Sequence, residues 1–170
     1  MTWWLFSFSM TLAIIATGED LWRRRVSNVI TGPAFLIGLA VNVILAGSSD
    51  LGYLSGLGNS LLGGLIGFVA FLPFFLKGGM GGGGIKLMAA FGAILGRERI
   101  ILAAILAAIS GGLMAVLYLL GRKVWRAVKG KSLEPATTPD LKAYIPYAPA
   151  ISIGVFLSFL SEDEIWTSVS

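Results

Sequence analysis

Carboxylates are the candidate catalytic groups of this chain. It contains no histidine and no cysteine among its 170 residues, which removes imidazole bases, thiol nucleophiles and Cys-rich zinc sites. Two of its acidic residues, Glu19 and Asp20, stand at the end of the first apolar run, just ahead of Arg23. A charged group at such a position is costly unless it is paired or functional. Position alone therefore allows an ion pair with Arg23 or Arg24, the simpler interpretation, or a catalytic role.

A glycine stretch is the second candidate. Six of the seven residues from Gly78 to Gly84 are glycine, and Ile85 and Lys86 follow. Glycine favours irregular backbone, as in a flexible linker or where another peptide approaches closely. We therefore expect no stable helix through these glycines. A phosphate-binding loop would need serine or threonine after its lysine, but Lys86 precedes Leu87.

The composition indicates which kind of structural element holds these candidate groups in place. Apolar residues make up 56% of the chain and charged residues only 13%, against about 25% charged in soluble domains. This predicts an all-α, polytopic membrane protein formed by one domain, residues 1–170. Crossing a hydrocarbon core of about 30 Å takes roughly 20 apolar residues. About six transmembrane helices are predicted, over residues 2–21, 29–47, 58–76, 85–96, 100–120 and 145–160, of which the fourth is short. No basic residue precedes the first, so it is interpreted as a retained helix rather than a signal peptide.

The basic residues predict the orientation. Eleven of the 13 lie in three alternate connections, about 22–28, 77–86 and 121–144. The positive-inside rule places these connections in the cytoplasm and both termini outside, in the inner (cytoplasmic) membrane. The same pattern accounts for the net charge of +4 without a nucleic-acid partner, and it requires the short fourth helix to cross.

Taken together, the two candidate segments resemble the type IV prepilin peptidases, membrane aspartic proteases with a G-x-G-D motif. Asp20-Leu-Trp-Arg-Arg-Arg-Val26-Ser27-Asn28 matches the spacing of that family's first aspartate, basic stretch and Ile-Pro-Asn-like sequence. Residues 79–92 match its second motif almost throughout, and residues 145–151 resemble the stretch that opens its last helix. The likeness extends over about residues 10–160.

The departure from the family falls on the second catalytic aspartate, which is Gly84 here. The resemblance implies that Asp20 is the first catalytic residue and that Gly84 marks the missing second one. Such a chain is expected to cleave little or nothing, whether Gly84 is an engineered or accidental inactivation or belongs to a naturally inactive relative. Neither a metal nor another cofactor is expected. Candidate substrate-binding residues beside these positions are Glu19, Gly81, Gly83 and Lys86.

The implied function is a membrane aspartic endopeptidase that removes the leader peptide from type IV prepilin-like (Flp/Tad pilin) precursors at the cytoplasmic membrane surface. Its partners would be membrane lipid and a prepilin-like substrate with a hydrophobic N-terminal helix. The chain lacks the Cys-rich insertion of longer, methylating members, so methyl transfer is not expected. The alternatives are a non-catalytic prepilin-binding scaffold and a small membrane transporter. A transporter should place several polar groups within the membrane, where the predicted helices offer mainly Asn42 and Asn59.

Overall fold

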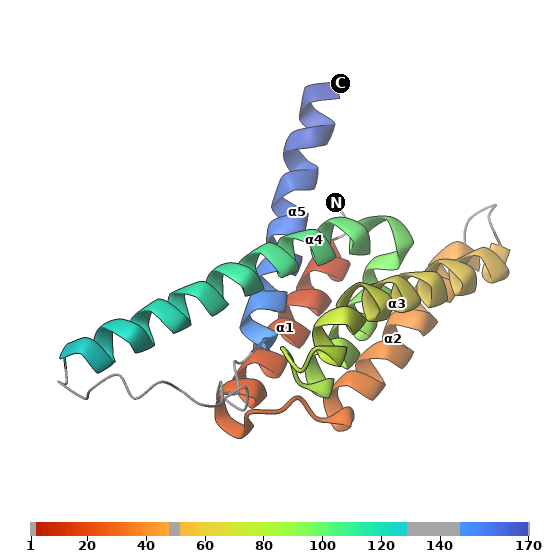
Figure 1. Cartoon of the computed structure of the whole chain (residues 1–170). Coiled ribbons are helices and arrows are strands. Elements are labelled where there is room, and N and C mark those ends of the chain that lie inside the picture. The colour runs from red at the N-terminus through yellow and green to blue at the C-terminus, as the bar shows by residue number, and fades with distance from the viewer. Residues whose placement is uncertain (1–2, 48–51, 129–146, 170) are drawn as a thin grey trace.

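The computed structural model describes residues 3–47, 52–128 and 147–169. In these ranges all regular structure is helical, as predicted, and forms five elements (Figure 1). They are α1 (Trp3–Arg23), α2 (Asn28–Gly47), α3 (Gly52–Leu76), α4 (Gly82–Val128) and α5 (Ala148–Val169). Within α4, two helices join at Gly96, whose φ of 78° is in the left-handed region. The described part of the chain thus contains six helical segments.

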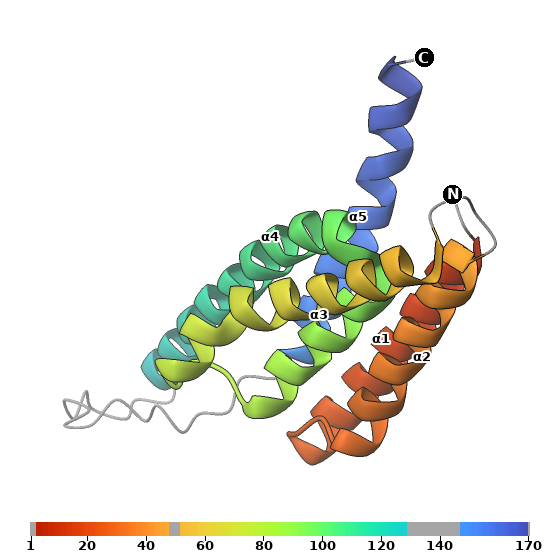
Figure 2. The same ribbon diagram turned by 90° about the vertical axis from the view of Figure 1, so that its right-hand side faces the viewer.

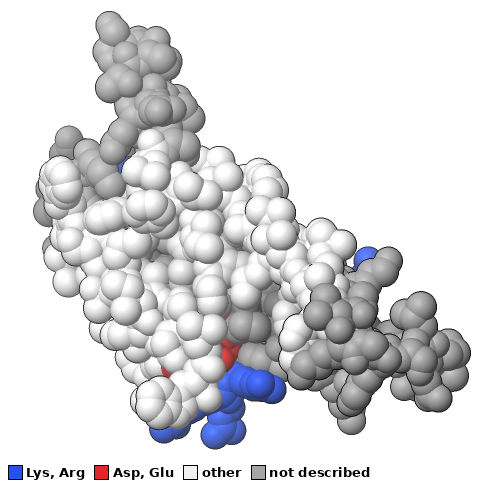
Figure 3. Space-filling view, turned by 90° about the vertical axis from the view of Figure 1, so that its left-hand side faces the viewer, with Lys and Arg blue, Asp and Glu red and all other residues white. Residues whose placement is uncertain are grey.

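The surface of the helices is suited to lipid. Large apolar side chains such as Ile37, Leu65 and Val116 are exposed, and Figure 3 shows a broad face without charge above a basic lower end. Within the described ranges, three helical segments are long and apolar enough to cross a membrane: α2, α3 and Gly82–Tyr118 of α4. The number of about six crossings is not confirmed, because α1 is not among these three segments and Ala148–Leu160 of α5 is a shorter apolar helix. The first arm of α4, Gly82–Leu95, is only about 21 Å long.

Glycines bring α3 and α4 into backbone contact. A Cβ atom on Gly63 would overlap the carbonyl oxygen of Gly92, and one on Gly67 would overlap that of Met88. The G-x-x-x-G spacing of Gly63 and Gly67 indicates such close packing of membrane helices, and the structure confirms it.

The bend in α4 is held by polar side chains from α2 and α3. At Gly96 the last carbonyls of one helical arm and the first N–H groups of the next lose their helical partners. Asn42 Nδ2 donates to the carbonyl oxygens of Ala93 and Ile94 at 2.9 and 3.1 Å. Asn59 Oδ1 accepts from the Arg97 N–H at 3.1 Å. With these three backbone groups hydrogen-bonded, α4 folds back sharply at Gly96 (Figures 1 and 2).

Two predicted loops are shorter than expected. Gly82, Gly83 and Gly84 open α4, so the prediction that no helix passes through the glycines is wrong at these positions. The N–H groups of a first helical turn have no partner inside the helix, whichever residues form it. The low helix propensity of glycine therefore matters less at these positions than its ability to pack closely against neighbouring backbone. Residues 121–128, predicted as loop, continue α4 because lysine and arginine are good helix formers. The remainder of that predicted loop, 129–144, lies outside the described residues.

Candidate functional site

Asp20 lies one turn before the end of α1 with its side chain buried, at 2% exposure. Its Oδ2 accepts a hydrogen bond of 2.9 Å from the backbone N–H of Ala148. Ala148 is the first residue of α5, so this N–H has no partner inside its own helix. The carboxylate therefore sits at the positive end of the α5 dipole, fixed by a residue 128 positions away.

Gly84 lies in the first turn of α4 and faces the same part of α5. A Cβ atom built on it would lie 3.6 Å from Ile151 Cδ1 and 3.7 Å from Tyr147 Cβ. It would also overlap the terminal methyl carbon of Met80, which is buried. Asp20 and Gly84 thus adjoin residues 147–151, which are Tyr147 and the first turn of α5. Met80 fills the space beside Gly84.

The two motif segments also contact each other directly. A Cβ atom on Gly83 would lie 2.8 and 2.9 Å from the backbone N and O of Val26, so only glycine allows this approach. Lys86 Nζ, one turn further into α4, donates to Asn28 Oδ1 at 2.9 Å. The connection after α1 is therefore packed on the start of α4.

The remaining candidate residues shape the local backbone. Glu19 Oε2 accepts a 2.8 Å hydrogen bond from the Ser27 N–H and so braces the connection between α1 and α2. That connection contains Arg24, whose φ of 54° is unusual for a residue with a side chain. The carbonyl of Gly81 accepts from the Gly84 N–H at 3.1 Å and begins α4. Substrate binding by Glu19, Gly81, Gly83 and Lys86 stays a prediction.

Sequence reasoning missed two contributors to the site. The donor from Ala148 is a backbone N–H, which leaves no side-chain signal in the sequence, although residues 145–151 resemble the stretch that opens the family's last helix. In the sequence Met80 is only the residue that interrupts the glycine stretch. Its position could not be inferred because the flexible thioether fills whatever gap the packing leaves.

Charge gathers at this end of the bundle. Arg23, Arg24 and Arg25 follow Asp20 and are exposed, and Figure 3 shows basic atoms at the lower end beside a small acidic area. In the part of the chain that the structure describes, no group of three or more His, Cys, Asp or Glu side chains could hold a metal ion. The chemistry offered by this site is that of one buried carboxylate, Asp20. Position 84 carries no side chain, and the space beside it is filled by the methyl group of Met80.

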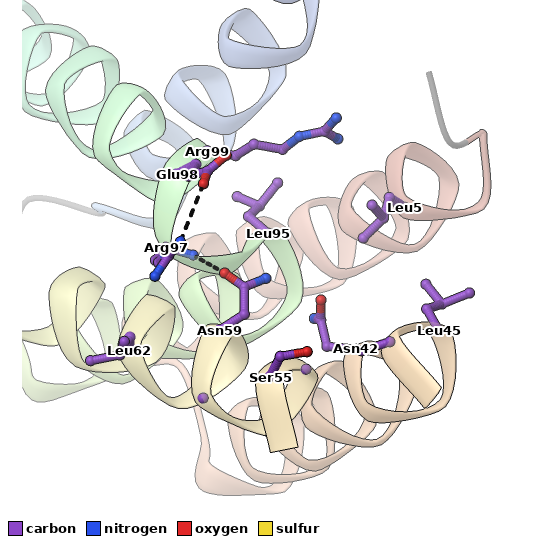
Figure 4. Close-up of a pocket in the computed structure, with 13 residues that line it drawn as sticks. Leu5, Asn42, Leu45, Ser55, Asn59, Leu62, Leu95, Arg97, Glu98 and Arg99 are labelled. Atoms are coloured by element: carbon purple, nitrogen blue, oxygen red, sulfur yellow. Dashed lines mark hydrogen bonds and ion pairs between the residues drawn. The ribbon is translucent and has the colours of Figure 1, made fainter. Parts of the chain in front are cut away.

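A pocket of about 640 Å³ lies at the other end of the bundle, beside the bend in α4 (Figure 4). It is lined by Asn42 and Asn59, which hold the bend, and by Arg97 and Glu98, whose charged groups are 3.7 Å apart. None of its lining residues belongs to the site around Asp20 and Gly84.

A comparison with protein families identifies the chain. The model of the type IV leader peptidase family matches residues 7–116. The chain belongs to this family. The match includes Asp20 and Gly84 and ends before α5. The residues at the start of α5 that adjoin both positions therefore lie outside the matched part of the chain. Comparison with curated proteins and with solved structures gives no match.

The close approach at Gly83 gives a first prediction. Gly83→Ala is expected to destabilise the protein by about 1–3 kcal/mol, because the new methyl group presses on the backbone of Val26. The matched control is Gly82→Ala, where a Cβ meets only Phe75 Cε2 at an ordinary 3.6 Å. Thermal unfolding in detergent measures both. Equal midpoints for the two variants would contradict the packing role of Gly83.

Proposed function

We propose that this chain is a prepilin-type leader peptidase that holds prepilin-like precursors but cleaves them little or not at all. One observation carries the proposal: Asp20 hydrogen-bonds to the first turn of α5, and a side chain at position 84 would point at the same turn. Two motifs 64 positions apart in the sequence thus converge on one place, with a carboxylate at the first and none at the second.

The proposed chemistry needs both positions. In a complete pair, one carboxylate activates a water molecule to attack the scissile carbonyl, and the protonated partner donates to the carbonyl oxygen. In this chain Asp20 is held by the Ala148 N–H, and the Met80 methyl group occupies the partner's place. General acid–base assistance contributes about 10²–10⁴-fold per group, so loss of the partner accounts for the proposed inactivity.

The proposed substrate has a short basic segment followed by a hydrophobic helix, and it would be cut near the inner surface of the cytoplasmic membrane. The placement of the charges supports this orientation. Three exposed arginines lie at the end of α1 and in the connection that follows it. That connection packs against the start of α4, and the Arg97–Glu98 turn lies at the far end of α4's first arm. Both termini are then on the outer side.

The alternative of a small transporter receives less support. Asn42 and Asn59, the polar residues that could line a route, hold the backbone groups freed at the bend of α4. Their hydrogen bonds account for their presence within apolar helices without a transported solute. A non-catalytic, prepilin-binding scaffold is also compatible with Gly84. It differs from an inactivated peptidase only in how Gly84 arose.

The proposal is tested with the unaltered chain co-expressed with a tagged prepilin-like protein. We expect the precursor to stay at full length on a gel and to be recovered with the chain in a pull-down after mild cross-linking. A precursor whose basic segment is replaced by neutral residues serves as the control. Cleavage by the unaltered chain would overturn the proposed inactivity, and absence of any association would overturn the proposed substrate.

A further inference from the structure

A narrow apolar groove lies on the lipid-facing side of the molecule, next to the site but separate from Asp20. It has a volume of about 370 Å³ and is bounded by α2, α3 and the first arm of α4. Its wall is formed by Phe35, Leu36, Phe68 and Ala89, and its polar end by Asn28 and Lys86. The groove therefore combines a hydrocarbon surface with one cationic group.

The charge at the polar end is available to a ligand. Lys86 is exposed, and its hydrogen-bond partner is the neutral amide oxygen of Asn28, at 2.9 Å. Among the described residues no carboxylate pairs with Lys86, so this contact leaves its ammonium charge uncompensated there and uses one of its three donors. An anionic oxygen beside Lys86 would gain both a charge interaction and hydrogen bonds.

The dimensions of the groove favour a thin occupant. Asn28 and Leu36 are eight residues apart on α2, a distance of about 12 Å along the helix axis. A helix 10–12 Å in diameter would fill about 1,000 Å³ over that length, far more than the 370 Å³ of the groove. A single hydrocarbon chain fits the space, whereas a substrate helix could insert only side chains.

We propose that this groove binds one anionic phospholipid, with the phosphate at Lys86 and an acyl chain along Phe35, Leu36 and Phe68. Lys86 lies in the second turn of α4, directly after the glycine stretch, where a headgroup would sit at the membrane surface. The bound lipid would pack against the start of α4 beside the site. This inference depends on the membrane character of the chain and not on its peptidase activity.

The test uses the full chain reconstituted in phosphatidylcholine vesicles that contain a trace of spin-labelled lipid. The association constant for motionally restricted label is measured for phosphatidylglycerol and for phosphatidylcholine by electron paramagnetic resonance. We expect about a fivefold preference for phosphatidylglycerol, the factor that corresponds to the roughly 1 kcal/mol from one basic residue at an anionic headgroup. Lys86→Gln should remove this preference and leave the binding of phosphatidylcholine unchanged.

Two further variants distinguish lipid binding in the groove from a general attraction of anionic lipid to the basic residues. Lys77→Gln, at the other end of the glycine stretch and outside the groove, should keep the preference. Gly32→Phe should reduce restricted binding of both lipids, because a Cβ at this groove position meets no atom within 4 Å and the ring has room to enter. An equal loss with Lys77→Gln, or no effect of Gly32→Phe, would overturn the proposal. Displacement of labelled lipid by a prepilin-like hydrophobic segment would assign the groove to the substrate instead.

Discussion

Gly84→Asp is expected to give this chain leader-peptidase activity. A side chain at position 84 points at the turn of α5 that binds Asp20, so the new carboxylate would complete the acid–base pair. Cleavage of a co-expressed prepilin-like precursor should rise by about 10²–10⁴-fold. Cleavage is measured as the shortened precursor on a gel, with the new N-terminus identified by mass spectrometry.

Met80 should limit the gain in the single variant. Its methyl carbon occupies the position of the new Cβ, so the thioether must move before the carboxylate can reach Asp20. Methionine has three rotatable bonds, and such a shift is possible without backbone movement. The double variant Gly84→Asp/Met80→Ala is therefore expected to cleave faster than Gly84→Asp alone, whereas Met80→Ala alone stays inactive.

The controls separate catalysis from changes in folding. Gly84→Asn places a side chain of nearly the same size in the same space without an ionisable carboxyl group, and should stay inactive. Asp20→Asn in the Gly84→Asp background should abolish the restored cleavage. If Gly84→Asp and the double variant both leave the precursor uncut while their thermal unfolding matches that of the parent, the assignment of this site is wrong.

Gly63→Leu is expected to disrupt the fold more than any other substitution considered. A Cβ on Gly63 would overlap the carbonyl oxygen of Gly92 and lie 2.7 Å from the carbonyl carbon of Gly96. Backbone atoms of a packed helix cannot move aside as a side-chain tip can, so α3 and α4 must separate. We expect a loss of at least about 3 kcal/mol, the upper part of the range for overpacking.

Gly58→Leu is the matched control, on the same helix and with the same change in helix propensity. A Cβ on Gly58 meets no atom within 4 Å, so Gly58→Leu should not destabilise the protein, and its higher helix propensity should raise the free energy of unfolding by up to about 1 kcal/mol. Thermal unfolding in detergent compares the two variants. Similar midpoints would show that α3 and α4 do not approach as closely as the structure indicates.

The sequence by itself determined the class of the protein. With 56% apolar and 13% charged residues, the chain has too few polar side chains to cover a surface that faces water. The preference of an apolar side chain for lipid is a property of each residue, so the class can be predicted without knowledge of the fold. Local spacing likewise predicted the packing glycines Gly63 and Gly67, because a four-residue interval places them on one helix face. The motif resemblance at Asp20 and Gly84 led to the family that the comparison then showed.

Only the tertiary structure decided how these parts meet. The glycines at 82–84 have weak local preferences, so the sequence around them does not decide whether they are helical. In the structure they open α4, and Gly83 packs against the backbone of Val26. The bend at Gly96 depends on Asn42 and Asn59 from two other helices, and the hydrogen bond from Ala148 to Asp20 joins residues 128 positions apart. Contacts over such separations follow from the packing of whole helices, which local patterns do not encode. The same packing put Met80 into the space beside Gly84.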